Sequence, residues 1–258
     1  MYTAELVTGV EALMRPLRGK RLLQAWEKGA TEPPLDRALT MLHAASPETS
    51  IEQLAELAIP QLNLQLLRLR QMSFGSTLSA YVPCPHCASR LEFTVALPPL
   101  IEQLETTAAC KGLQWKEGTL EYWLRPANSR DLMQVQAEGD SGRARALLLE
   151  RCVSAFPTNL TQEATQGIDA ACATLAVQNF NQLHAAAEIN LQLSCAACTC
   201  TELVDFDIAR FLWMEVRHAA TRLLRDVHEL ASAYGWNERA ILAMTPQRRN
   251  AYLEMVRS

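Results

Sequence analysis

The first third of the chain carries apolar residues at the three- and four-residue spacing of amphipathic helices. One apolar set is ended by Gly29, a second follows Pro33-Pro34, and a third runs over residues 60–72. Ser50 followed by Gln53 has the spacing of a capping box, which predicts the start of a further helix. The pattern therefore predicts an N-terminal region built from short helices.

The pattern then changes to apolar and polar residues in alternation, which is the period of a β-strand. The predicted strands are 78–82, 91–95, 118–124 and 189–193. Pro98-Pro99 is expected to close the second of them. Helical spacing returns between the third and fourth strands, and the helices predicted there are 129–137, 141–155 and 161–184. This middle part of the chain therefore mixes strands with helices.

The last 50 or so residues carry the clearest helical pattern. Asp207 can cap a long helix that Gly235 is placed to end, Asn237 can cap a short helix, and Thr245-Pro246 can start a final one. The apolar face of the long helix consists of Ile208, Phe211, Leu212, Val216, Ala219, Leu223, Val227 and Leu230.

Two Cys-x-x-Cys pairs supply the strongest chemical signal: Cys84 with Cys87, and Cys195 with Cys198. Each pair can offer two thiolates to one tetrahedral zinc ion, and two pairs make a four-thiolate site that is closed to water and therefore structural. About 107 residues separate the pairs, far more than in a local zinc ribbon, so a shared ion would close a long loop. Unligated thiols and a thioredoxin-like redox pair are the alternatives, and His86 and Cys200 are possible substitute ligands.

These features predict an α+β fold that is mostly α-helical. It contains a small zinc-ribbon-like β element, formed by the two distant cysteine knuckles, and a helical C-terminal tail. The expected division is a helical N-terminal region over 1–77, a zinc-stapled β element with a helical insertion over 78–206, and a helical C-terminal region over 207–258. Structural Zn²⁺ is the one cofactor that we expect.

Composition narrows the class of protein. Hydrophobic residues make up 49% of the 258 residues and charged residues 20%, which suits a folded chain with a sizeable core. The formal net charge of −4 argues against a general nucleic-acid binder, which would carry a basic surface. We see no signal peptide and no apolar run approaching the ~20 residues of a membrane span, so we expect a cytoplasmic protein without a membrane partner.

The remaining chemical candidates are weak. Cys152 and Cys172 lie in apolar helical runs and are interpreted as small core residues. His228-Glu229 resembles the start of a zinc-protease motif, but the second histidine is missing. We find no nucleophile elbow and no phosphate loop, so we expect no catalytic residues, no small-molecule substrate and no enzymatic activity.

The C-terminal sequence does resemble a known family. Residues 223–244, from Leu223-Leu224-Arg225-Asp226 to Ile241-Leu242-Ala243-Met244, are similar to a signature of T4-like phage baseplate hub assembly proteins. Residues 245–255 look like the basic end of that signature. Three further segments resemble the longer bacterial members of this family. They are the first cysteine pair with Leu91-Glu92-Phe93, residues 124–132, and residues 206–213 after the second pair. Such knuckles often have glycine after the second cysteine, where this chain has Ala88 and Thr199.

The resemblance implies a non-catalytic assembly factor, or a minor component, of the baseplate hub in a contractile phage tail or contractile injection system. Its partners would be hub or spike proteins, contacted through amphipathic C-terminal helices. It would lie in the cytoplasm of the bacterial host or become part of a phage-tail-like particle. The alternatives are a zinc-ribbon nucleic-acid-binding regulator, which the acidic balance disfavours, and a metal-dependent hydrolase, for which four thiolates leave no open metal position.

Overall fold

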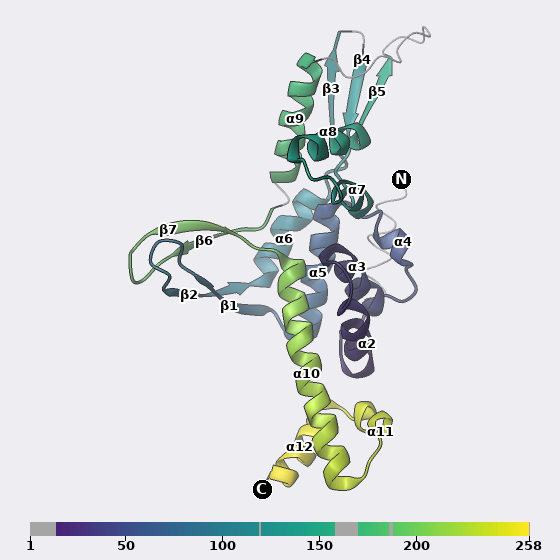
Figure 1. The fold of residues 1–258 in the computed structure, drawn as a ribbon, viewed down its shortest axis with the longest axis vertical. Coiled ribbons are helices and arrows are strands. Elements are labelled where there is room, and N and C mark those ends of the chain that lie inside the picture. The colour runs from purple at the N-terminus through teal and green to yellow at the C-terminus, as the bar shows by residue number, and fades with distance from the viewer. Residues whose placement is uncertain (1–13, 119, 158–169, 186–187, 258) are drawn as a thin grey trace.

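The computed structural model describes residues 14–118, 120–157, 170–185 and 188–257. It is an elongated molecule with a helical body in the middle, a mixed lobe at one end, a helical extension at the other and a β arm at the side (Figure 1). None of the helices in these ranges combines the length and apolar content that a bilayer span requires.

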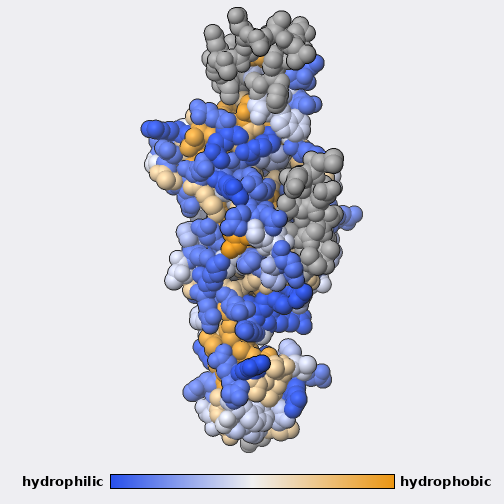
Figure 2. All heavy atoms as spheres, turned by 90° about the vertical axis from the view of Figure 1, so that its right-hand side faces the viewer, coloured by the Kyte–Doolittle hydropathy of each residue, from blue (hydrophilic) through white to orange (hydrophobic). Residues whose placement is uncertain are grey.

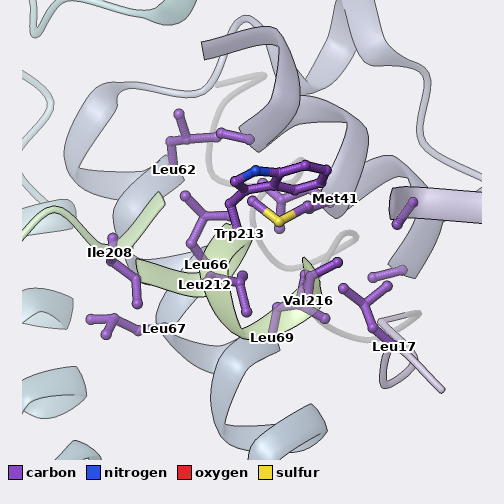
Figure 3. Close-up of a cluster of buried hydrophobic side chains, with 14 of the residues drawn as sticks. Leu17, Met41, Leu62, Leu66, Leu67, Leu69, Ile208, Leu212, Trp213 and Val216 are labelled. Carbon is purple, nitrogen blue, oxygen red and sulfur yellow. The ribbon is translucent and has the colours of Figure 1, made fainter. Parts of the chain in front are cut away.

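The body is formed by α2 (Gly19–Gly29), α3 (Pro34–Ala45), α4 (Ile51–Leu54), α5 (Ile59–Phe74), α6 (Leu97–Ala108) and the first half of α10 (Ile208–Tyr234). Its core joins residues that lie far apart in the sequence: Leu66 and Leu69 of α5 meet Leu212, Trp213 and Val216 of α10 (Figure 3). All five are at most 7% exposed. The start of α10 is therefore an integral part of the body.

The predicted helix ends are confirmed where capping residues were expected. Ser50 accepts a hydrogen bond from the Gln53 N–H and completes the capping box at α4. Asp207 and Asn237 accept hydrogen bonds from the backbone N–H groups at the starts of α10 and α11 (Glu238–Ala243). Gly235 ends α10 in the left-handed conformation, with φ 68. These short-range patterns fix where the helices begin and end.

The lobe contains the three-stranded antiparallel sheet β3 (Leu113–Glu117), β4 (Leu120–Leu124) and β5 (Val153–Pro157), with β4 in the middle. Helices α7 (Ser129–Val135), α8 (Ser141–Cys152) and α9 (Ala170–Ala185) complete it (Figure 1). Its small core includes Leu124, Cys152 and Leu183. It is thus a second, smaller cluster beside the main core.

A buried carboxylate joins the elements of this lobe. Asp131 of α7 accepts hydrogen bonds from Arg125 at 2.6 and 3.0 Å and from Arg151 of α8 at 2.9 Å. Burial alone would raise the pKa of Asp131, but the guanidinium of Arg125 and the backbone N–H of Asn128 hold it below its ordinary value. Asp131 is 0% exposed, so its pairing with the two arginines satisfies a charge that would otherwise be costly.

The arm consists of two antiparallel hairpins that project side by side from the body (Figure 1). The first pairs β1 (Thr77–Pro83) with β2 (Arg90–Ala96), and the second pairs β6 (Asn190–Ser194) with β7 (Thr201–Asp205). Strand β1 continues from α5, β2 leads into α6, and β7 leads into α10. The arm therefore branches from the helices of the main core.

Arg70 of α5 holds the base of the arm. It is 3% exposed, and its guanidinium donates two hydrogen bonds to Glu215 of α10, at 2.8 and 2.9 Å. The same group donates to the carbonyl oxygens of Gly75 and Thr77, at 2.7 and 2.8 Å. One side chain thus links α5, α10 and the first residue of β1.

The extension contains the second half of α10, together with α11 and α12 (Pro246–Arg257). Leu230, Ile241 and Leu253 form its small core; beside it the rings of Tyr234 and Trp236 stack, and Tyr252 meets both of them edge-on. The Arg248 N–H donates to the Thr245 hydroxyl at 3.3 Å, as the predicted Thr-Pro helix start requires. The extension therefore carries its own hydrophobic cluster below the body.

The predicted fold class is confirmed: the chain is mostly helical, with small antiparallel sheets and a ribbon-like cysteine element. The boundaries at 77/78 and 206/207 stay a prediction, and the main core takes residues from both sides of each. Residues 161–169 of one predicted helix lie outside the described residues.

The structure differs from the sequence prediction at three elements. Strand β2 does end just before Pro98-Pro99, at Ala96, but these prolines also occupy the first turn of α6, where a missing N–H costs nothing. The helix predicted to reach residue 155 ends at Cys152, because Val153 turns into β5 and pairs with Leu124. The strand β3 was missed altogether.

Candidate metal centre

The tip of the arm brings together the four cysteines that the sequence singled out. The sulfur atoms of Cys84, Cys87, Cys195 and Cys198 all lie within 4.8 Å of one another. The Sγ atoms of Cys84 and Cys198 are 3.7 Å apart, and so are those of Cys87 and Cys195. Each of these short distances joins one hairpin to the other, so the cluster bridges the long insertion between the pairs.

The two turns that present the cysteines have the same hydrogen-bond pattern. In the first, the Cys84 N–H donates to the Ser89 carbonyl at 2.8 Å and the Ala88 N–H donates to the Cys84 carbonyl at 2.9 Å. In the second, the Cys195 N–H donates to Cys200 and the Thr199 N–H donates to Cys195, both at 2.8 Å. Each turn thus curls around its own first cysteine and directs both thiols to one side.

Both turns need a left-handed residue immediately after the second cysteine. Ala88 has φ 58 and Thr199 has φ 59, and they are the only residues other than glycine with positive φ in the described ranges. The absence of glycine at these positions therefore does not prevent the knuckle geometry. It does leave conformational strain in each turn, because a Cβ atom disfavours this region.

The spacing of the sulfur atoms fits a tetrahedral metal ion. A zinc–sulfur bond of ~2.3 Å places the sulfur atoms of a regular tetrahedron about 3.8 Å apart, close to the two 3.7 Å separations observed. The same separations are far from the ~2.05 Å of a disulfide bond, and all four cysteines are free. The group could therefore hold one metal ion.

The electrostatics of the cluster also call for a cation. Hydrogen bonds from Ser89 lower the pKa of Cys87 to about 6, which favours the thiolate form that binds a metal ion. The Cys200 N–H acts to lower the pKa of Cys198, but desolvation and hydrogen bonding with the other three cysteines raise it overall. Four sulfur atoms this close cannot all be thiolates unless a positive ion lies among them.

Two of the four cysteines are buried within the arm. Cys84 and Cys195 are each 3% exposed and pack with Leu91 and Val82 of the first hairpin, whereas Cys87 is exposed and Cys198 partly exposed. The site therefore has two thiols inside the arm and two toward its surface.

The two substitute ligands do not join the cluster. His86 points to the other hairpin, where its Nε2 lies 2.5 Å from Glu202 of β7. Cys200 is outside the four-sulfur group and contributes its backbone carbonyl to the second turn. The sequence did not predict the contact between His86 and Glu202, because it depends on how the hairpins lie against each other.

The other residues singled out from the sequence lie elsewhere. Cys152 is 1% exposed, and burial raises the pKa of its thiol to about 11, so it is a core residue as predicted. The side chain of Cys172 lies outside the described residues. His228 is exposed on α10, and Glu229 receives two hydrogen bonds from Arg257. They are not part of any metal-binding group found among the described residues.

Comparison of the chain with protein-family models, curated proteins and solved structures finds no match. The chemistry of the site is therefore inferred from its own residues and the distances between them. Two hairpins, one from each end of the long insertion, form a four-cysteine site that could hold a metal ion at the tip of the arm.

Proposed function

We propose that this chain is a non-catalytic assembly factor, or a minor component, of the baseplate hub in a contractile phage tail or contractile injection system. It binds hub or spike proteins, in the bacterial cytoplasm or within the assembled particle. The resemblance of residues 223–255 to baseplate hub assembly proteins motivates this proposal. A four-thiolate ligand set supports a non-catalytic role, because it leaves no metal position for a substrate.

The observation that carries the proposal is the apolar surface of the extension. Leu224 on α10 is 36% exposed and Met255 on α12 is 65% exposed. Near them a shallow hollow of about 840 Å³ lies between the two helices. Leu224, Ala233 and Val256 supply its apolar lining, and the rest comes from polar residues of α10, which are Thr221, Arg225, His228, Glu229 and Ser232. Exposed apolar side chains gathered between two helices are typical of a surface that receives a partner's helix or loop.

The test must leave the body intact. Removing residues 207–258 would take away Leu212 and Val216, which are buried in the main core, and would unfold the protein. The double variant Leu224→Asp/Met255→Asp instead places two charges on the extension. It should lose capture of purified hub and spike proteins in a pull-down.

A matched control uses Met72→Asp/Leu203→Asp. Met72 is 40% exposed and Leu203 is 67% exposed, and both lie outside the extension. This control should keep full capture. Equal capture by both double variants and the wild type would refute docking through this surface, and no capture by the wild type would refute the proposed function.

We further propose that the ion in the arm is a structural Zn²⁺ held by Cys84, Cys87, Cys195 and Cys198. Support comes from the donor set, since four thiolates in a tetrahedron are the preferred environment of structural zinc. Metal analysis of the purified protein should give one zinc per chain. Cys84→Ser should lower this content sharply, whereas Cys200→Ser should leave it unchanged; loss of zinc in both variants would contradict the ligand assignment.

A further inference from the structure

A basic cleft separates the start of α2 from the extension. Its volume is about 980 Å³, and it is lined by residues of α2, α10, α11 and α12 and by the end of α5. Leu17 and Leu223, which are 1% and 4% exposed, form part of its apolar floor together with Leu242. Figure 2 faces the side on which α2 and α11 lie, and the molecule narrows there, with hydrophobic side chains at the waist and hydrophilic ones beside them.

The charged lining of this cleft is almost entirely positive. The start of α2 contributes three cations, α10 two and α12 two, which are Arg18, Lys20, Arg21, Arg222, Arg225, Arg249 and Arg257. Asp226 is the one carboxylate among the lining residues. This concentration stands out in a chain whose formal net charge is −4. The cleft is therefore a local positive region on an acidic protein.

Several of these cations have no internal counter-charge. Arg249 faces Asp226 at 3.4 Å, and Arg257 pairs with Glu229 at 2.8 Å. The side chains of Arg18, Lys20, Arg222 and Arg225, by contrast, have no ion-pair or hydrogen-bond partner within the part of the chain that the structure describes. Four unpaired cations around one concavity repel one another, and an anionic ligand would relieve that repulsion.

Two further features add to the positive potential. Residues 18–21 at the start of α2 line the cleft, so the positive end of this helix dipole lies at its edge, and the N-cap residue Arg18 makes no side-chain capping bond there. An adjoining hollow of about 530 Å³ shares Arg222 and Arg225 and adds Arg217, and its one carboxylate, Glu215, is already paired with Arg70. The positive surface thus continues along α10 for about two helical turns, which is longer than a single small anion requires.

We propose that this basic cleft binds a carboxylate-rich segment of a partner protein. Arginine predominates over lysine in the lining, and the guanidinium fork matches carboxylates with two parallel hydrogen bonds. The apolar floor suits the apolar side chains of a peptide, which a bare polyanion lacks. Nucleic acid is disfavoured because the negative charge of the whole chain would repel it. This inference rests on the proposed function, because it takes the ligand to be part of a partner protein.

The test uses the full-length, metal-loaded chain and a fluorescent peptide of alternating glutamate and leucine as the probe. Binding is measured by anisotropy at low and at moderate salt. We expect saturable binding that weakens with salt, because part of the attraction is screened. Arg222→Glu/Arg225→Glu should weaken binding by roughly tenfold or more, since each lost charge-assisted hydrogen bond approaches that factor.

The matched control reverses two exposed arginines outside the cleft, Arg210→Glu/Arg239→Glu, with the same change in net charge. It should leave the affinity nearly unchanged. Equal weakening in both double variants would overturn the cleft as the site, as would the absence of peptide binding to the wild type.

Two more titrations separate the other ligands. A double-stranded oligonucleotide that binds more tightly than the peptide at the same salt would overturn the proposal in favour of nucleic acid. Inorganic phosphate that displaces the peptide at low concentration would reassign the cleft to small anions. Hub capture without peptide binding would defeat only this inference, whereas peptide binding without hub capture would defeat only the proposed function.

Discussion

Replacing Ala88 by glycine should stabilise the metal-binding turn. Ala88 has φ 58, and a left-handed conformation costs a residue with a Cβ about 1–2 kcal/mol. Glycine avoids this cost, but it gives the unfolded chain more freedom, which offsets about 0.4–1 kcal/mol. The net gain in the free energy of unfolding should therefore be about 0.5–1 kcal/mol. Thr199→Gly should gain less than its φ of 59 implies, because it loses the hydroxyl hydrogen bond to the Cys198 carbonyl, 2.7 Å long.

The gain can be measured in two ways on the metal-loaded protein. Chemical denaturation gives the free energy of unfolding, and competition with a chromophoric chelator gives the metal affinity, which should rise by a factor of roughly two to five. Gly235→Ala provides the reverse control, because Gly235 has φ 68 and an added Cβ would meet no atom within 4 Å. It should lose about 1 kcal/mol. If Ala88→Gly lowers both the stability and the metal affinity while Gly235→Ala behaves as expected, the left-handed conformation of residue 88 is not a source of strain and the reasoning is refuted.

Three further substitutions test the packing of the body and lobe. Gly112→Ala should destabilise the protein by about 3 kcal/mol in denaturant unfolding, because a Cβ there would lie 2.2 Å from the Leu124 carbonyl oxygen; a neutral result would contradict the β3–β4 pairing. Gln65→Leu should raise the free energy of unfolding by about 1–2 kcal/mol, and with it the melting temperature, because both amide atoms of the fully buried Gln65 lack partners among the described residues. A lower melting temperature would reveal a bound water or another partner. Asp131→Asn should lower stability by about 2 kcal/mol at neutral pH, and the difference should shrink as the pH falls below ~4, because the pKa of Asp131 is depressed by Arg125 in the folded state; a pH-independent difference would refute the ionic role.

The sequence predicted those features that are encoded locally. The cysteine pairs were recognisable because each Cys-x-x-Cys is complete within four residues, and matched pairs imply a shared site. The caps at Ser50, Asp207 and Asn237 and the end at Gly235 were recognisable because capping involves neighbours along the chain. Such short-range patterns predict structure because they do not depend on which residues pack around them.

The features that were missed depend on distant partners. Val153 follows a helical run, and only its pairing with Leu124 turns it into a strand. Arg70 follows Leu69 in an amphipathic helix, and no neighbouring residue indicates that it pairs with Glu215, which lies 145 residues later. The basic cleft was missed because its cations come from three helices that meet only in the folded chain. The start of α6, by contrast, was foreseeable from prolines followed by Ile101, Leu104 and Ala108 at helical spacing.

The contacts of Arg70 have a consequence for how the arm responds to loss of its ion. The guanidinium fixes the first residue of β1 to α5 and α10, whereas the cysteines join the hairpins only at the far end. A chelator would therefore leave the two hairpins joined by the contact between His86 and Glu202 and by the packing of β2 on β6, while Arg70 keeps the first hairpin in its original direction. Reloading would need only a local search by the second hairpin, which favours rapid and reversible recovery of the closed form.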